Sequence, residues 1–494
     1  MQFQSFNYIL LFFPLTLVLY YLNEKVLYRN IILIIASYIF YAWGNPLWGV
    51  LLFLASSVDF LVSKKLGALN LKLEMAENPL QGNILLQKRV LLILSLCFSF
   101  GLLAFFKYWN WIIEVLYGIR FNNYVLDLRL FKHTMEIPVG ISFYTFETVS
   151  YTIDVYRKKL RPTNSFINYL SFISFFPHLV AGPILRAHDL LPQLENLKKK
   201  VTSKVAESAF FLISWGLFKK IVFADNLGNL VDRSKENINS PGVGFILVMA
   251  FAFQIYCDFS AYSDIARGTA KLFGVQLKRN FLTPYFALNP RDFWQRWHIT
   301  LSSWVRDYVY IPLGGNRCRG IRNMFNGILT MFLMGLWHGA GKFFVLWGIY
   351  HGALIVLYRI VPLDSYLIKF LGTLWGKVTS IAVMFLFTLF GWLLFWVRSD
   401  EDFQQIFQSL IRVRYLITDF SLIPTGFYEL GYGLLLFTAP IIITEIIGFR
   451  YKREFVDMNR FFNTKIKSTL YLIMFYGVLF FGMRGSYDFV YFQF

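Results

Sequence analysis

Residues 324–340, MFNGILTMFLMGLWHGA, form an apolar stretch. Near its C-terminal end a histidine, His338, stands between a tryptophan and a glycine. The stretch is long enough to enter a bilayer, so His338 is expected in or beside lipid. A titratable ring at such depth needs a partner or a purpose, which makes His338 the first candidate functional residue. Part of the phrase returns at 349–353, IYHGA, and brings His351 into the same short region.

Comparable apolar runs recur along the whole chain. Its 494 residues are 56% hydrophobic and 20% aromatic, which is more apolar surface than a soluble core of this size buries. The runs lie near residues 6–22, 30–43, 46–62, 90–117, 138–152, 166–185, 206–224, 242–262, 324–340, 343–361, 380–397, 431–448 and 468–483. A spanning helix needs about 20 mostly apolar residues. We therefore expect an all-α polytopic membrane protein with about eleven transmembrane helices, the shorter runs forming re-entrant or interfacial helices.

No linker or low-complexity tract divides the chain, so residues 1–494 are expected to form a single integral-membrane domain. The first apolar run lacks a basic lead-in and a small-residue cleavage site, which indicates a retained helix. Lys25 and Arg29 follow it and predict a cytoplasmic first connection. The block 254–353 concentrates acids, arginines, glycines and histidines among aromatic residues, and we expect the catalytic core there.

The net charge of +19 comes from lysines and arginines in short connections between apolar runs. Anionic lipid headgroups and an inside-positive topology explain this distribution better than nucleic acid does. The three cysteines, Cys97, Cys257 and Cys318, specify neither a disulfide framework nor a metal site. The chain also lacks the motifs of a zincin-type protease, a nucleotide-binding P-loop and a serine hydrolase.

Residues 292–311 are predicted to form one amphipathic helix. Its aromatic face would carry Trp294, Trp297, His298, Leu301, Trp304, Val305 and Tyr308, and its polar face Arg296, Thr300, Ser303 and Asp307. A helix of this polarity would lie at the membrane interface or pack inside the protein as a re-entrant element. The residues alone leave open a simple interfacial anchor in which His298 is merely hydrogen-bonded.

His338 is surrounded by Gly335, Gly339 and Gly341, which would let a helix or the thin arm of an acyl donor approach the imidazole closely. A neutral imidazole accepts a hydroxyl proton near physiological pH, so general base is its natural role. A buried histidine bonded to a neighbouring carbonyl is the structural alternative. For His351 that alternative is at least as good as a functional role.

Asp258 and Asp264 lie at the end of an apolar run, where unpaired acids are costly. Arg267, Lys278 or Arg279 could pair with them. We favour a structural or site-orienting network over direct catalysis for these two acids.

An ordered set of segments resembles the membrane-bound O-acyltransferase family, in particular its bacterial polysaccharide O-acetylation branch. The set comprises residues 38–43 (YIFYAW), 138–147 (PVGISFYTFE), 176–183 (FPHLVAGP), 258–264 (DFSAYSD), 293–298 (FWQRWH), 336–339 (LWHG) and 491–494 (YFQF). Residues 362–465 carry nothing diagnostic.

The resemblance implies a fold in which helices surround a central tunnel. The family's near-invariant histidine falls on His338, and its second histidine falls on His298 as a donor-positioning or tunnel-lining residue. The resemblance also implies a thioester donor, acetyl-coenzyme A or an acyl-carrier thioester, with no tightly bound cofactor or metal. We expect tunnel-lining or orienting roles for Trp294, Trp297, Trp337, Asp258, Asp264, Arg306, Asp307 and His351.

From this resemblance we expect a multi-pass protein of the bacterial cytoplasmic membrane that moves acetyl groups for O-acetylation of a cell-envelope polysaccharide. Alginate-like polymers and peptidoglycan are both open as the acceptor, and the expected partner is a separate extracytoplasmic acetyltransferase protein. Within the same fold, D-alanyl transfer to teichoic acid is the alternative. A flippase or transporter for a glycan or lipid, and a purely structural scaffold, are alternatives from other classes.

Overall fold

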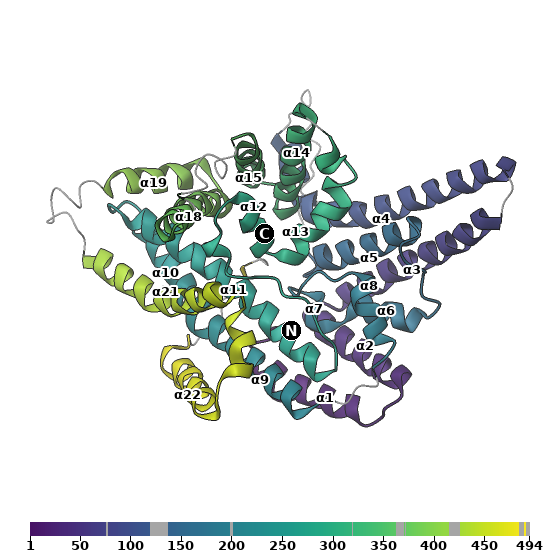
Figure 1. Cartoon of the computed structure of the whole chain (residues 1–494), viewed down its shortest axis with the longest axis horizontal. Helices are drawn as coiled ribbons and strands as arrows, with labels where there is room; N and C mark the ends of the chain where they lie inside the picture. The colour runs from purple at the N-terminus through teal and green to yellow at the C-terminus, as the bar shows by residue number, and fades with distance from the viewer. Residues whose placement is uncertain are drawn as a thin grey trace. The chain divides into compact units, whose positions relative to one another are not determined.

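The computed structural model describes most of the chain, and every regular element in the described part is helical (Figure 1). The described residues are 1–75, 78–118, 137–197, 201–318, 320–361, 370, 372–413, 425–483 and 489–490. The motif at 491–494 lies outside them. The predicted all-α class is confirmed for the described residues.

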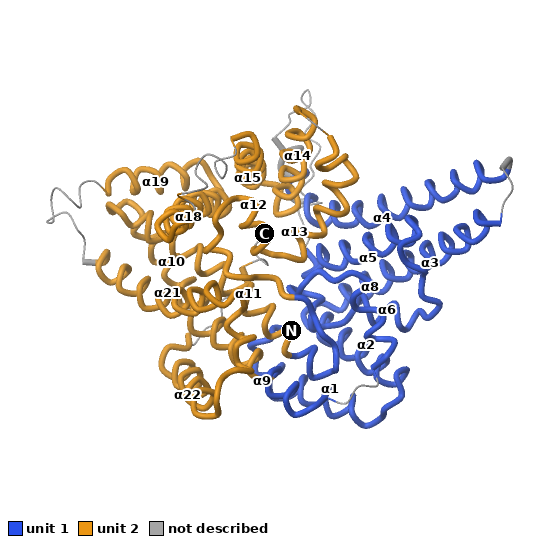
Figure 2. The backbone as a smooth tube through the Cα atoms, in the orientation of Figure 1, with its two compact units in different colours: residues 1–209, 269–278 blue, residues 210–268, 279–494 orange. Residues whose placement is uncertain are grey.

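The chain divides into two compact units, which Figure 2 distinguishes by colour. The first unit contains residues 1–209 and 269–278, and the second contains 210–268 and 279–494. The block 254–353, predicted to be the catalytic core, belongs to the second unit except for 269–278. The single domain expected from the sequence stays a prediction.

The helices up to residue 197 all belong to the first unit. They are η1 (Asn7–Phe12), α1 (Phe13–Tyr21), α2 (Val26–Ala42), α3 (Pro46–Met75), α4 (Asn78–Gly118), α5 (Ile141–Tyr156), α6 (Phe166–Ser174), α7 (Phe176–Leu179) and α8 (Ala187–Leu194).

The remaining helices run from residue 203 to the C-terminal region. They are α9 (Ser203–Phe218), η3 (Lys219–Ala224), α10 (Asp225–Glu236), α11 (Val243–Leu272), η4 (Pro284–Phe286), α12 (Pro290–Arg296), α13 (Ile299–Val305), η5 (Arg306–Tyr310), η6 (Gly315–Arg317), α14 (Ile321–His338), α15 (Lys342–Ile360), α18 (Leu374–Trp396), α19 (Asp400–Ile411), α21 (Thr425–Tyr451), η8 (Phe455–Phe461) and α22 (Thr464–Phe481).

Seven helices of the described chain are long and apolar enough to cross a membrane. They are Pro46–Met75, Leu80–Trp109, Val243–Leu272, Lys342–Ile360, Leu374–Trp396, Gly426–Tyr451 and Thr464–Phe481. Two shorter apolar helices, Asn7–Tyr21 and Val26–Ala42, precede them. These candidate spans make the chain a multi-pass membrane protein. The larger number of about eleven spans, expected from the sequence, stays a prediction.

The candidate spans differ in how far they are enclosed by protein. In α11, 89% of the most apolar window is buried, whereas in α22 only 6% is. The acids of α11 therefore lie among protein side chains rather than against lipid, which is where intramembrane charges can be paired.

Helices α14 and α15 lie side by side (Figure 1). Glycines in both helices permit this close packing. A Cβ atom on Gly348 would lie 2.4 Å from the Met331 carbonyl oxygen, and one on Gly335 would lie 2.3 Å from that of Phe344. Small residues let backbones approach in this way within membranes. Of the two predicted uses of the glycines near His338, close approach of a helix is therefore confirmed.

In the first unit, two segments singled out from the sequence meet in a buried contact. The Nδ1 atom of His178 lies 3.1 Å from Oε1 of Glu147, and both side chains are fully buried. The same carboxylate oxygen accepts a hydrogen bond of 2.9 Å from the Leu185 backbone N–H. These contacts tie α5 to the segment around α7.

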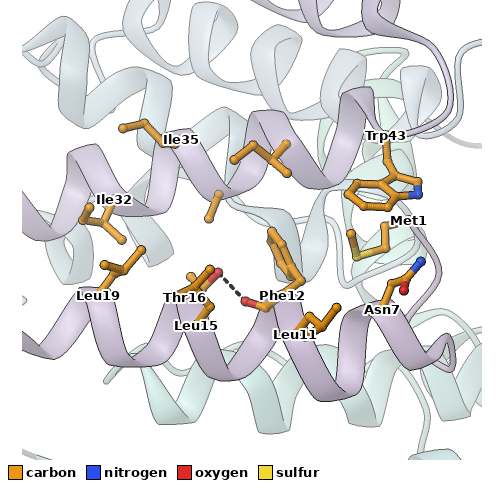
Figure 3. A pocket seen from close by; sticks show the side chains of 12 residues that line it. Met1, Asn7, Leu11, Phe12, Leu15, Thr16, Leu19, Ile32, Ile35 and Trp43 are labelled. Atoms are coloured by element: carbon orange, nitrogen blue, oxygen red, sulfur yellow. Dashed lines mark hydrogen bonds between the residues drawn. The ribbon is translucent and has the colours of Figure 1, made fainter.

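A shallow apolar groove runs between α1 and α2 in the same unit (Figure 3). Thr16 is one of its few polar side chains, and its hydroxyl donates to the Phe12 carbonyl at 2.7 Å, so it adds little polarity. Asn7 and Trp43 lie together at one end. No titratable side chain lines this groove, so its side chains supply no group for proton transfer.

Candidate functional site

His338 is the last residue of α14, and its side chain is buried. Three aromatic rings surround the imidazole with centroid distances of 4.6 Å for Trp337, 5.0 Å for Trp347 and 4.9 Å for Phe395. The latter two meet it nearly perpendicularly, at 86° and 81°. The ring is thus held in one orientation by rigid neighbours from α14, α15 and α18, as a positioned acid–base group requires.

His351 is connected to His338 through Trp347, whose ring contacts both imidazoles. It is buried in α15, four residues after Trp347, and its ring centroid is 4.9 Å from that of Trp347 and 5.2 Å from that of Trp294. Helix α18 approaches it closely, because a Cβ on Gly391 would lie 2.7 Å from Nε2. The structure therefore brings together four of the predicted site residues, His338, Trp337, His351 and Trp294.

The continuous helix predicted for 292–311 is wrong. Helix α12 ends at Arg296, Trp297 is extended, and His298 adopts a left-handed conformation with φ 41° and ψ 55° before α13 begins at Ile299. A non-glycine residue in this region carries strain, and such strain is concentrated at functional sites.

Asn280 explains why the chain breaks at this point. Its carbonyl accepts the Ile299 N–H at 2.8 Å, and its side-chain oxygen accepts the Thr300 hydroxyl at 2.6 Å. The side-chain amide donates to Ser263 of α11 at 3.2 Å. These hydrogen bonds replace the helical ones that would have continued α12 into α13.

The break leaves His298 buried, with its ring edge-on to Phe259 at a centroid distance of 4.6 Å. Burial lowers the pKa of His298 to about 3, so its imidazole is neutral at physiological pH. Trp297 is also buried, and its ring packs on that of Trp392 at 4.7 Å. The sequence left open an interfacial helix or one packed inside the protein, and both side chains lie inside the protein.

The two histidines belong to one aromatic system. A continuous series of ring contacts leads from His298 to His338 through Phe259, Phe281, Trp297, Trp392 and Phe395. Every step is between 4.6 and 5.7 Å from centroid to centroid. Close-packed rings of this kind hold both imidazoles in fixed orientations.

Asp258 lies in a buried ion-pair network. Its Oδ1 is 2.9 Å from Nζ of Lys220, which also lies 2.8 Å from Asp225, and its Oδ2 accepts the Val490 N–H at 2.7 Å. Both partners of the Asp258–Lys220 pair are almost completely buried. The arrangement supports a structural role, since both carboxylate oxygens already have partners.

Asp264 is paired in the same way. Lys219 lies 2.7 Å from its Oδ2, and Arg267 lies 3.3 Å from its Oδ1. Arg267 was one of the predicted partners, whereas Lys278 pairs instead with Asp189 in the first unit. Lys219 and Lys220 were missed, although two lysines inside the apolar run 206–224 already required acidic partners.

Arg306 and Asp307 form an ion pair with each other, at 2.7 Å between Nε and Oδ1. The Arg306 side chain is 62% exposed, so the pair lies at the protein surface in η5. Their predicted orienting role stays a prediction.

Sequence reasoning also missed Trp347, Phe395 and Trp392. Trp347 could have been found, because it precedes His351 by four residues and shares its helix face. Phe395 and Trp392 come from α18, in the part of the chain without diagnostic motifs, and only the fold brings them to His338.

Comparison with known proteins gives a consistent picture. The model of the membrane-bound O-acyltransferase family matches residues 82–398. A Pseudomonas putida protein named probable alginate O-acetylase AlgI is 36% identical over 396 residues, covering 80% of this chain and 77% of its own. The peptidoglycan O-acetyltransferase of Helicobacter pylori is 31% identical, covering 78% and 75%. The teichoic acid D-alanyltransferase of Bacillus subtilis is 26% identical, covering 55% and 71%.

Proposed function

Because the chain belongs to the membrane-bound O-acyltransferase family, we propose that it moves acetyl groups from a thioester donor for O-acetylation of a cell-envelope polysaccharide, with His338 as the general base. The O-acyltransferase activity itself follows from the family and from relatives named O-acetylase and O-acetyltransferase. The polysaccharide and the role of His338 are the proposed parts.

The observation that carries the proposal is the position of His338. The imidazole is buried at the C-terminal end of α14, where the hairpin formed by α14 and α15 turns, and it is fixed by Trp347 and Phe395. A thioester is already activated, so the protein has only to align two substrates and accept one proton. General base catalysis by a positioned imidazole contributes roughly 10²–10⁴-fold.

In the proposed reaction His338 takes the proton of the attacking hydroxyl group, while the oxygen of that hydroxyl group forms a bond to the thioester carbon. The carbonyl electron pair moves onto the carbonyl oxygen and returns as the carbon–sulfur bond breaks. The thiolate then takes the proton from the imidazolium, which restores the neutral base. The apolar rings around His338 keep bulk water away and so limit hydrolysis of the thioester.

His298 has a positioning role in this proposal. It is neutral because of its low pKa, it is buried, and its backbone is held in a strained conformation. A group of this kind orients a substrate or the tunnel wall rather than exchanging protons at physiological pH. Trp297, which directly follows α12 and packs on Trp392 of α18, supports the same wall.

The proposed donor is acetyl-coenzyme A or an acyl-carrier thioester, reached from the cytoplasmic side of the bacterial inner membrane. The proposed final acceptor is peptidoglycan or an alginate-like polymer, with a separate extracytoplasmic transferase completing delivery. Support comes from the two relatives whose names include these polymers. D-alanyl transfer to teichoic acid is the second candidate, supported by a less similar relative that matches about half of the chain.

The experiment measures alkali-labile esters on purified envelope glycans from cells with the native gene, without the gene, or with His338→Ala at matched membrane abundance. Acetate that is lost in both mutants supports acetyl transfer through His338, and the glycan fraction that loses it identifies the polymer. Released alanine in place of acetate supports the second candidate. Near-normal acetate in the His338→Ala cells would show that His338 is not the base.

A further inference from the structure

Three aromatic side chains beside His338 form a closed triangle. Trp294 comes from α12, while Trp347 and His351 come from α15, and their ring centroids are 4.9 to 5.7 Å apart in every pair. His338 contacts this triangle through Trp347. The triangle therefore lies next to the proposed base. Its rings come from two helices, α12 and α15, that are far apart in the sequence.

Each ring of the triangle carries a buried nitrogen for which the described part of the chain provides no hydrogen-bond partner. The atoms are Nε1 of Trp294, Nε1 of Trp347 and Nδ1 of His351. The side chains are only 9%, 1% and 2% exposed, so bulk water does not satisfy them. Native proteins pair almost all buried polar groups, and each exception calls for an explanation. Three such nitrogens on rings that contact one another favour a site for a bound polar group.

The chemistry of the three nitrogens defines what fits. An indole N–H is a donor only, and a neutral imidazole nitrogen is either a donor or an acceptor. Two donors beside such a nitrogen suit an oxygen atom with free lone pairs, either a carbonyl or a hydroxyl oxygen. A metal ion is excluded at this triangle because indole N–H groups offer it no lone pair.

We propose that Trp294, Trp347 and His351 bind a substrate oxygen atom next to His338 by hydrogen bonds from their ring nitrogens. This inference rests on the proposed acetyl transfer, which supplies two such oxygens, the thioester carbonyl and the acceptor hydroxyl. If the carbonyl oxygen binds, the indole N–H groups stabilise the negative charge that it gains when the hydroxyl attacks. If the hydroxyl oxygen binds, they hold the nucleophile in line for attack.

The test uses the full-length protein in detergent, with acetyl-coenzyme A as the probe and release of free thiol as the readout. Trp294→Phe and Trp347→Phe keep an aromatic ring and remove only the N–H edge. His351→Asn keeps a polar atom near the position of Nδ1, whereas His351→Leu removes it. Trp215→Phe is the matched control, since Trp215 is buried in α9, where it packs on Phe455.

Thiol release is measured without an acceptor, as hydrolysis, and with deacetylated envelope glycan, as transfer. We expect each tryptophan variant to lose about 10²-fold in transfer rate, with His351→Asn retaining more activity than His351→Leu. An equal loss of hydrolysis assigns the oxygen to the thioester carbonyl. Unchanged hydrolysis with lost transfer assigns it to the acceptor hydroxyl. Near-wild-type transfer in both tryptophan variants, with His338→Ala inactive, overturns the proposal.

Thermal stability separates a substrate site from a structural hydrogen bond. Trp215→Phe measures the loss from shrinking a buried ring. Trp347→Phe should lose no more than this, because the Trp347 N–H has no hydrogen-bond partner in the part of the chain that the structure describes. A much larger loss for Trp347→Phe would also overturn the proposal.

If the wild-type protein transfers no acetyl group, the proposed function fails. The triangle is then tested by whether acetyl-coenzyme A raises the melting temperature of the wild type more than that of Trp347→Phe.

Discussion

The imidazole of His338 meets the indole of Trp347 edge to face, with ring centroids 5.0 Å apart and ring planes at 86°. The contact joins the end of α14 to the first half of α15, and it depends on how closely these two helices approach. Glycines set that distance, so the orientation of the candidate base depends on positions that carry no side chain.

Gly348→Ala should therefore impair the protein without touching the imidazole. The new Cβ would lie 2.4 Å from the Met331 carbonyl oxygen, which is backbone and cannot rotate away. We expect α15 to shift, the protein to lose about 1–3 kcal/mol of stability and acetyl transfer to fall with it. Melting temperature in detergent and transfer rate measure the two effects.

Gly327→Ala is the control on the same hairpin. Its Cβ would meet only Val356 at 3.4 Å, an ordinary contact, and alanine favours a helix. We expect unchanged activity and equal or higher stability. Similar losses in both variants would show that the close approach at Gly348 has no special importance.

The left-handed conformation of His298 gives a second prediction. Asparagine is common in this region of φ and ψ, whereas a β-branched residue is an outlier there. Both variants lose the packing of the buried ring, but His298→Asn should keep the left-handed backbone, and His298→Val should lose about 1–3 kcal/mol more than His298→Asn. Thermal unfolding of the two variants checks this, and equal stability would contradict the strained backbone. Both should transfer acetyl groups more slowly, because both remove the ring that packs on Phe259.

The pH dependence of stability tests the burial of His298. Its pKa is about 3 when folded and about 6.5 when unfolded, so between these values only the unfolded state binds the proton. Stability must then fall as pH decreases through this window, by up to about 1.4 kcal/mol per pH unit. His298→Asn should flatten the decline in melting temperature between about pH 6.5 and about pH 4.5. An unchanged slope would mean that the imidazole is accessible to protons.

The helical membrane class could be predicted because it depends on local composition. Apolar runs of helical length are read directly from the sequence, and the run ending at His338 forms α14 up to that residue. The glycines around it likewise indicated a close neighbour. These features need no knowledge of distant residues.

The break at Trp297 and His298 could not be predicted in the same way. No proline or glycine marks it, and the periodicity of 292–311 continues through it unchanged. The cause is tertiary, because Asn280 accepts hydrogen bonds from Ile299 and Thr300 in place of the helical acceptors. Phe395 is similar, since nothing in its local sequence connects α18 with α14.

The buried lysines give the last prediction. Lys220 lies within 3 Å of carboxylate oxygens on both Asp258 and Asp225, and all three side chains are almost completely buried. Lys220→Met removes the cation and leaves two buried acids without it, which should cost about 3–5 kcal/mol. Arg233→Met removes an exposed pair with Glu429 and should cost less than about 1 kcal/mol. Thermal unfolding of both variants in detergent gives the comparison.

Equal, small losses of stability in the two variants would mean that the buried carboxyl groups are protonated and that the network is held by neutral hydrogen bonds. Loss of folding in Lys220→Met that is rescued by adding Asp258→Asn would show instead that unpaired charge is what the lysine prevents.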